Sequence, residues 1–251
     1  MKTMTLALFL LGALTGWGIN TVSEDQMKDW YPRYSKQANA PDPEEMLLNT
    51  APEPADLETG FVELYNGRNL DGWVVRGGEH LFEAKGEWIQ AICVPGSPST
   101  YLTTVKDDYT DFIFTCEVKY VVDANTGIQF RSGVRTEDGK EVVYGPQFEM
   151  EEESRIRGWS GGIYGQSCGG YWYPLWLDAH KAVREAVDYD NWNRVTIYAR
   201  GDLLMTWING IPAGKVILDE FPSGFFALQS HSGKQGTILF RGMRVKELPS
   251  D

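Results

Sequence analysis

The segment GPQFEMEEES, residues 145–154, places four glutamates within five positions, directly after a proline and a phenylalanine. In a β-strand the side chains alternate between two faces. The polar and apolar side chains would then separate as Gln147, Glu149, Glu151 and Glu153 against Phe148 and Met150. Carboxylates two positions apart lie about 6.5–7 Å from each other at Cα. Their repulsion can raise one pKa and leave an acid beside a base. A solvated acidic edge is the alternative that this stretch alone leaves open.

A second polar pair lies in TGIQFRSG, residues 126–133. If this stretch is also a strand, Gln129 and Arg131 share a face. Arg131 could then pair with a glutamate or hold a substrate oxygen, or it could form an ordinary surface salt bridge. Paired carboxylates on a sandwich sheet would suit the chemistry of some glycoside hydrolases.

Histidine is the third candidate, because it can transfer protons near neutral pH. His231 follows the apolar run ALQS and precedes Ser232 and Gly233. A strand that ends there would put Gln229 and His231 on one face. The alternative is a structural histidine, and we assign that role to His80 and His180.

The loop WSGGIYGQSCGGYWYPLW, residues 159–176, combines glycines with aromatic residues. Exposed Trp and Tyr rings can stack on the C–H faces of sugars. Tyr164 and Trp172 are therefore candidates for ligand contact. Packing of these rings onto the body of the protein is the alternative.

The elements that would position these residues are short strands separated by turns, from Phe61 onward. In DFIFTCEVKYVVD, residues 111–123, apolar and polar residues alternate as in a half-buried strand. Residues 194–217 predict two hairpins, and Asn209-Gly210 is a strong type I′ turn signal. A register change across Gly242 predicts a β-bulge, and residues 178–187 could form one short helix. We therefore predict an all-β, two-sheet antiparallel jelly-roll sandwich of the concanavalin A-like type.

Composition and charge narrow the class of ligand. The 251 residues are 42% hydrophobic and carry a net charge of −12. Nucleic acid and anionic membranes need clustered basic residues, so neither is predicted as a partner, whereas a neutral sugar is compatible with this charge. Cys93, Cys116 and Cys168 match no zinc-binding spacing, and an exported chain could form one disulfide among them.

The chain divides into three parts. Residues 1–18 combine one lysine with an apolar run and are typical of a secretory signal peptide. Export to the periplasm or the extracellular space is therefore predicted, with no membrane span after signal removal and no lipid anchor. Residues 19–59 lack apolar periodicity and predict a largely irregular linker, with a short helix near residues 44–48. Residues 60–249 form the predicted sandwich domain.

Six motifs together resemble the 3-keto-disaccharide hydrolase domain family, long described as a domain of unknown function. They cover about residues 61–248 in order. In this chain they are FVELYNGRNLDGW, TGIQFRSG, YGPQFEME, SGGIYGQSCGGYWYP, NWNRVTIYARGDLLMTWINGIPA and GFFALQSHSGKQGTILFRGMRVKEL. The family's Asp-Glu after GGIY is Gly165-Gln166 here, and Glu151 stands where the family's strand has an aspartate.

The resemblance implies a jelly-roll enzyme that acts on glycosides oxidised to a ketone at C3. Such a ketone acidifies the hydrogen on C2, so a base can form an enolate that expels the aglycone from C1. The candidate roles are proton transfer by Glu149 and His231 and oxygen binding by Arg131 and Gln147. The other candidates for substrate contact are Gln129, Gln229, Glu151, Tyr164 and Trp172. The expected substrate is an oxidised disaccharide or glycoside, cleaved by elimination or net hydrolysis.

Two other functions stay open at this point. One is a glycoside hydrolase that acts on unoxidised β-glucan through Glu149 and a partner such as Glu153, and the other is a non-catalytic carbohydrate-binding module. The fold alone does not choose among the three. We predict no cofactor; carboxylates and histidine could bind a divalent metal, but no spacing demands one. We make no prediction of the oligomeric state.

Overall fold

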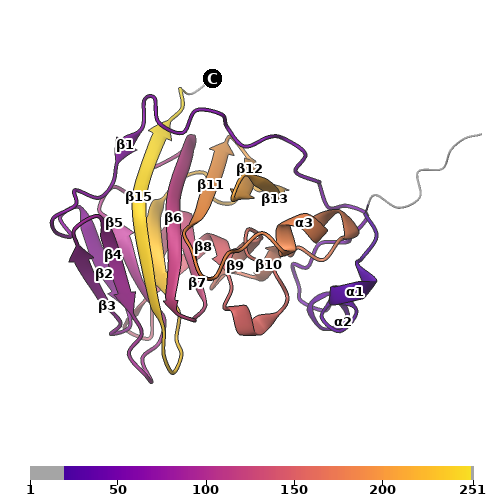
Figure 1. The fold of residues 1–251 in the computed structure, drawn as a ribbon, viewed down its shortest axis with the longest axis horizontal. Helices are drawn as coiled ribbons and strands as arrows, with labels where there is room; N and C mark the ends of the chain where they lie inside the picture. Colours follow the sequence, from indigo (N-terminus) through magenta and orange to yellow (C-terminus); the bar gives the residue numbers. More distant parts are fainter. Residues whose placement is uncertain (1–19, 250–251) are drawn as a thin grey trace, which may run out of the picture.

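The computed structural model describes residues 20–249, so the predicted signal peptide at residues 1–18 lies outside the described residues. Two antiparallel sheets pack face to face and enclose the core (Figure 1). This arrangement confirms the predicted two-sheet jelly-roll sandwich. The candidate residues in β8 and β9 belong to the smaller sheet.

The eight-stranded sheet has the order β13-β12-β11-β6-β15-β4-β3, with β1 paired to β15. Its strands are β1 (Val62–Glu63), β3 (Leu81–Lys85), β4 (Trp88–Ile92), β6 (Phe112–Val122), β11 (Asn193–Arg200), β12 (Leu203–Ile208), β13 (Ile211–Ile217) and β15 (Thr237–Glu247). The seven-stranded sheet has the order β10-β9-β8-β7-β14-β5-β2. Its strands are β2 (Trp73–Gly77), β5 (Thr100–Thr104), β7 (Thr126–Glu137), β8 (Lys140–Met150), β9 (Ile163–Gln166), β10 (Gly170–Tyr173) and β14 (Phe225–Ser230).

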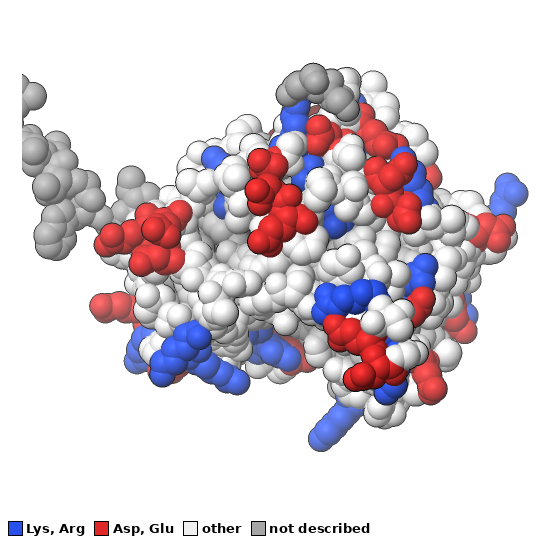
Figure 2. All heavy atoms as spheres, turned by 180° about the vertical axis from the view of Figure 1, so that it is seen from behind, with Lys and Arg blue, Asp and Glu red and all other residues white. Residues whose placement is uncertain are grey.

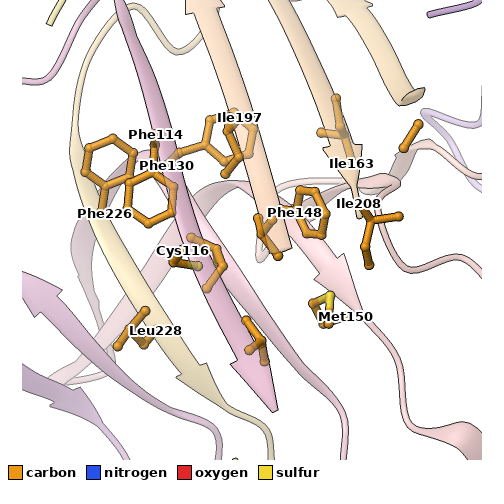
Figure 3. Packing of buried hydrophobic residues seen from close by; sticks show 14 of the residues in the cluster. Phe114, Cys116, Phe130, Phe148, Met150, Ile163, Ile197, Ile208, Phe226 and Leu228 are labelled. Carbon is orange, nitrogen blue, oxygen red and sulfur yellow. The ribbon is translucent and has the colours of Figure 1, made fainter. Parts of the chain in front are cut away.

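Alternation along the strands builds the core between the sheets. Phe148 and Met150 of β8 are fully buried and point inward, whereas Gln147 and Glu149 face the outer side of the seven-stranded sheet. Figure 3 shows Phe148 beside Ile208 of the other sheet, and Met150 farther along, among side chains from both sheets. Removing such side chains from water is the dominant stabilising contribution in a sandwich of this kind. The predicted division of β8 into a core face and an outer face is therefore confirmed.

Local sequence signals set several turns. Asn209 and Gly210 both have positive φ, 51° and 83°, as a type I′ turn requires, and they join β12 to β13. The pairing of β15 with β6 shifts register between Arg241 and Arg244, around Gly242. The short helix predicted within residues 178–187 is present as the 3₁₀ turn η2 (Asp178–His180) followed by α3 (Lys181–Arg184).

The segment predicted to be a largely irregular linker packs against the sandwich. Residues 43–45 form a turn instead of the predicted helix, and two helical turns lie earlier, α1 (Glu24–Met27) and α2 (Tyr31–Tyr34). Met27 is fully buried, and its sulfur accepts a hydrogen bond from Trp159 Nε1 at 3.2 Å. Met46 Sδ likewise accepts from Trp176 Nε1 at 3.0 Å. Met27 and Met46 therefore anchor the segment to the sandwich, although it forms no long helix or strand.

Figure 2 shows acidic and basic side chains interspersed over one face of the molecule, with uncharged areas between them. The three cysteines are free thiols, and Cys93 and Cys116 are buried. Within residues 20–249, no helix is long and apolar enough to cross a membrane.

Candidate active site

Glu149 is a buried carboxylate held by two amide donors on the outer side of the seven-stranded sheet. Only 4% of the residue is exposed. Asn125 Nδ2 donates to Oε1 at 2.9 Å, and Gln147 Nε2 donates to Oε2 at 2.8 Å. Hydrogen bonds to a charged acceptor are stronger than neutral ones, so these two donors fix the carboxylate in one orientation.

Gln147 is in turn held by a series of hydrogen bonds in which each side chain donates toward Glu149. Gln129 Nε2 donates to Gln147 Oε1 at 2.6 Å, and Ser132 Oγ donates to Gln129 Oε1 at 2.7 Å. An ionised carboxylate only accepts hydrogen bonds, so Glu149 dictates which way each amide points. We call this series, from Ser132 through Gln129 and Gln147 to Glu149, the amide relay.

Glu149 lies in a polar cavity of about 260 Å³, which we call the polar pocket. The lining side chains come from the N-terminal segment, from β8 to β10 and from the loops at one end of the sheet. They are Tyr34, Gln37, Asn125, Gln147, Glu149, Arg155, Arg157, Tyr164, Gln166, Tyr171 and His231. Among the described residues that line the pocket, Glu149 is the sole carboxylic acid.

Arg157 supplies positive charge in the wall of this pocket. Its Nη1 donates to the Tyr34 hydroxyl at 2.7 Å, and its Nη2 donates to the Tyr171 hydroxyl at 2.8 Å. A guanidinium only donates hydrogen bonds, so both phenols act as acceptors here and keep their own O–H hydrogens for another partner. No protein acceptor for either hydrogen is found within residues 20–249. Burial raises the pKa of Tyr171 well above its usual value, which keeps that donor protonated.

His231 lies at the edge of the polar pocket, half-buried, just past the end of β14. Its Nδ1 is 2.8 Å from the Ser232 carbonyl oxygen. Because a carbonyl can only accept, Nδ1 carries a hydrogen, and Nε2 is left for proton exchange. His80 and His180 are both buried and do not line the pocket.

Glu151 lies one position beyond the end of β8 and does not line the polar pocket. It is 1% exposed and forms an ion pair with Arg157, and its Oε2 accepts from the Trp159 backbone N–H at 3.0 Å. Burial raises the pKa of Glu151 to about 7, and Arg157 acts in the opposite direction. Glu151 therefore positions Arg157, which corrects its predicted role as a residue in contact with substrate. Glu153 is exposed in the 3₁₀ turn η1 (Glu153–Arg155) and also lies outside the pocket.

Arg131 is not in the pocket, which corrects the predicted role as an oxygen-binding group. Its φ is +44°, and the pairing of β7 with β8 shifts register between Gln129 and Gly133. The resulting bulge breaks the alternation that would have placed Gln129 and Arg131 on one face. Arg131 instead donates to the carbonyl oxygens of Thr110 and Gly201, each at 2.7 Å, and pairs with Asp111 at 3.1 Å.

The remaining predicted residues divide between the pocket wall and its support. Tyr164 lines the pocket, and its ring meets that of Tyr171 edge-on, with centroids 4.9 Å apart. Gln229 is fully buried behind the pocket and donates to Gln166 Oε1 at 3.2 Å. Trp172 packs against Phe221, with centroids 5.3 Å apart, and does not line the pocket.

Several pocket residues were not predicted from the sequence. Tyr34 and Gln37 lie in the segment expected to be a linker, and nothing in the local pattern signals their docking. Arg157 follows β8 in a stretch without periodicity. Tyr171 could have been predicted, because it lies in the same aromatic loop as Tyr164 and pairs directly with it across β9 and β10. In the described part of the chain, no group of three or more His, Cys, Asp or Glu side chains is arranged to hold a metal ion.

Comparisons with known proteins identify the family of the domain. Residues 60–246 match the family model of the 3-keto-alpha-glucoside-1,2-lyase-like domain. The chain belongs to this family. The family match begins after the N-terminal segment, so Tyr34 and Gln37 are contributions from outside the matched domain. A comparison with curated proteins found no match.

Solved structures share the fold of this 3-keto-alpha-glucoside-1,2-lyase-like domain at low identity. Two structures of a "putative glycosyl hydrolase" from Parabacteroides distasonis ATCC 8503 have TM-scores of 0.54 and 0.52 at 18% and 17% identity. Their alignments cover 76% and 75% of this chain and 95% and 99% of those chains. A Bacillus subtilis protein of unknown function with a galectin-like fold has a TM-score of 0.51 at 10% identity, over 72% of this chain and 92% of that one.

Proposed function

We propose that the protein cleaves 3-keto-glycosides by removing the proton from C2 of the oxidised sugar. The observation that carries this proposal is the single carboxylate of the polar pocket, Glu149, oriented by Asn125 and Gln147. In the same pocket, the hydroxyls of Tyr34 and Tyr171 accept hydrogen bonds from the buried guanidinium of Arg157. Proton abstraction beside a ketone needs one base and one group of donors for the developing oxyanion, and this pocket contains both.

The bonds change in two steps. Glu149 takes the C2 proton, and the C–H electron pair forms the C2=C3 bond of an enolate whose oxygen is negative. Tyr34 and Tyr171 donate hydrogen bonds to that oxygen, and the charge of Arg157 strengthens both donors because hydrogen bonds in series polarise one another. The enolate then reforms the C3 ketone, creates a C1=C2 bond and expels the oxygen at C1. His231 enters this step with both ring nitrogens protonated, gives the leaving oxygen its proton from Nε2, and is left as the neutral ring with its hydrogen on Nδ1.

Water can afterwards add across the C1=C2 bond, with its hydroxyl at C1 and its proton at C2. That addition gives net hydrolysis of the glycosidic bond. Without it, the product is an unsaturated keto sugar and the reaction is a lyase reaction. The base, the oxyanion donors and the acid are the same in both outcomes.

The polar pocket favours this proposal over an ordinary glycoside hydrolase. Cleavage of an unoxidised glycoside generally uses two carboxyl groups that flank the bond, about 5–9.5 Å apart. Among the described lining residues Glu149 has no such partner, because Glu151 is bound to Arg157 and Glu153 is exposed outside the pocket. A binding module could use a carboxylate to accept hydrogen bonds from sugar hydroxyls, so the comparison with it rests on turnover.

A substrate comparison tests the proposed function. The protein is incubated with a glucoside and with the same glucoside oxidised at C3, and the released alcohol is measured. We expect cleavage of the oxidised form alone. Cleavage of the unoxidised glucoside would support an ordinary glycoside hydrolase, and binding without cleavage would support a carbohydrate-binding module.

We also propose that the chain is exported and that residues 1–18 are removed as a signal peptide. The support is the sequence of those residues, with one lysine before an apolar run. N-terminal sequencing of the secreted protein tests this proposal. An N-terminus at Met1 would contradict it.

A further inference from the structure

The far half of the β7–β8 hairpin bends over the outer face of its own sheet. The bulge at Arg131, opposite Gly145 with φ of +132°, separates this half from the part that carries Gln147 and Glu149. β8 and β2 have three strands between them in the sheet, yet Glu141 of β8 accepts from Arg76 Nη1 of β2 at 2.6 Å. In a flat sheet these two residues would be too far apart to touch, so the far half of the hairpin lies across the concave outer face of the sheet.

A small second core holds the hairpin in that position. It consists of the buried residues Tyr101, Val143, Phe225 and Ala227, with Val134 packed against them. Tyr101 and Ala227 lie on neighbouring strands of the sheet floor, and Val143 comes from the hairpin above. At the other side, Arg135 Nη2 donates to the Ser167 carbonyl oxygen at 2.8 Å in the turn between β9 and β10.

The hairpin and the floor of the sheet enclose a second cavity of about 460 Å³, which we call the hairpin cavity. Its walls include Pro98, Ser99 and Tyr101 from the floor and Val142 and Val143 from the hairpin. Gln166 lines both this cavity and the polar pocket, so the two spaces adjoin. His231 is also close to the boundary, because the backbone N–H of its neighbour Ser232 donates to Ser99 Oγ at 3.0 Å.

We propose that the hairpin cavity is the subsite for the leaving group and that it takes one uncharged pyranose ring. This inference rests on the proposed function, since it assigns the other half of the same substrate. Pro98 and Val142 offer an apolar surface to the C–H face of a sugar, with the buried Tyr101 and Val143 packed behind them, and Ser99 and Gln166 can hydrogen-bond its hydroxyls. The expelled oxygen then lies at the boundary of the two cavities, beside the histidine that protonates it.

A neighbouring loop cavity is the competing location. It has a volume of about 390 Å³ and also adjoins the polar pocket, through Asn125 and His231. Its walls carry the charged side chains of Asp123, Glu152 and Lys234. The hairpin cavity has two charged lining residues, Lys140 and Glu141, and Glu141 is already paired with Arg76 at 2.6 Å, so its charge is met within the protein. An uncharged ring gains less in the loop cavity than on the apolar wall of the hairpin cavity, because it would displace water from charged groups without replacing their charge.

The test compares two 3-keto-glucosides that differ in the leaving group alone. One is a disaccharide, which releases a sugar, and the other is the methyl glycoside, which leaves the second cavity empty. The measured quantity is the ratio of kcat/KM for the disaccharide to kcat/KM for the methyl glycoside. Val142→Phe narrows the hairpin cavity, and we expect the ratio to fall about ten-fold or more. The matched control Lys234→Ala alters the loop cavity and should leave the ratio within about two-fold.

Activity on the methyl glycoside shows whether Val142→Phe is folded. If that variant does not fold, Val142→Ala removes apolar contact with less strain, and the ratio should fall about three-fold. An unchanged ratio in the Val142 variants, or a change in Lys234→Ala instead, would overturn the hairpin cavity as the subsite and leave the proposed function standing. No cleavage of either substrate by the unaltered protein would overturn the proposed function, and the subsite with it.

Discussion

Replacing Glu149 by glutamine should separate chemistry from folding, because the amide relay can adapt to the change. A glutamine at this position presents one acceptor and one donor. Its oxygen can keep the hydrogen bond from Gln147 Nε2, and its NH₂ group then faces Asn125. Asn125 can turn over to present Oδ1, an atom that is buried and has no hydrogen-bond partner in the described structure. One side-chain flip therefore satisfies the new amide.

The expected magnitudes follow from these contacts. Two charge-assisted hydrogen bonds become neutral ones, at a cost of about 1 kcal/mol each. The variant also no longer buries a carboxylate, which offsets part of that cost. We therefore expect the free energy of unfolding to change by less than about 2 kcal/mol, or a Tm shift below about 8 °C for a chain of this length. Loss of the base should lower kcat/KM by about 10²–10⁴-fold.

The assay measures kcat/KM on a 3-keto-glucoside together with a thermal melt. Gln147→Leu is the matched control, because it removes one donor to Glu149 and also leaves Gln129 Nε2 without an acceptor. Each unsatisfied buried group costs about 1–3 kcal/mol, so this control should be less stable than Glu149→Gln but more active. Near-normal turnover by Glu149→Gln, or the reverse order of the two variants, would refute the reasoning.

Three further substitutions test other parts of the site. Arg131→Leu should lower the free energy of unfolding by about 3 kcal/mol or more, because it leaves the Asp111 carboxylate without its partner charge. The kcat/KM of this variant per folded molecule should equal that of the parent. A loss of kcat/KM in the folded variant would show that Arg131 acts in catalysis. Tyr34→Phe removes one oxyanion donor and should lower kcat about 10²-fold; an unchanged kcat would exclude that role. Glu151 has a raised pKa in the folded state, from 4.5 to about 7, so its stabilising contribution is full below pH 4.5 and is lost as the pH rises through 7. Relative to Glu151→Gln, the free energy of unfolding of the parent should fall by up to about 3 kcal/mol between pH 4.5 and pH 7. Chemical denaturation at a series of pH values measures this, and the same pH dependence in both proteins would contradict it.

The sequence predicted those parts of the site that depend on local periodicity. The alternation in β8 places Gln147 and Glu149 on one face because a strand repeats every two residues. The same rule puts Gln229 and His231 on the outer face of the sheet. Asn209-Gly210 predicted its turn because both positions tolerate positive φ.

The parts that depend on irregular backbone could not be predicted in this way. Arg131 has a positive φ that is uncommon outside glycine, and the bulge it forms turns its side chain away from Glu149. Glu151 continues the pattern in sequence, but β8 ends at Met150 and the next residues turn toward Arg157.

Tertiary docking explains the remaining difference. Tyr34 reaches the pocket because the segment before the family domain lies along the end of the sandwich, anchored by buried methionines. A short segment without periodicity gives no signal of where it packs, since its stability comes from the surface it covers. The guanidinium of the site is accordingly Arg157, supported by Tyr34 and Tyr171, where the sequence had predicted Arg131.

The fate of the hydrogen on C2 tests the central claim most directly. A 3-keto-glucoside carrying deuterium at C2 is cleaved in ordinary water, and the sugar product is weighed by mass spectrometry, with an enzyme-free sample to correct for spontaneous exchange. Proton abstraction by Glu149 predicts that deuterium at C2 slows cleavage and is absent from the unsaturated product. When water adds afterwards, C2 regains deuterium only to the extent that Glu149 returns it before exchange with water. Cleavage at an unchanged rate with the deuterium fully retained on C2 would contradict the account, because it would mean direct displacement at C1.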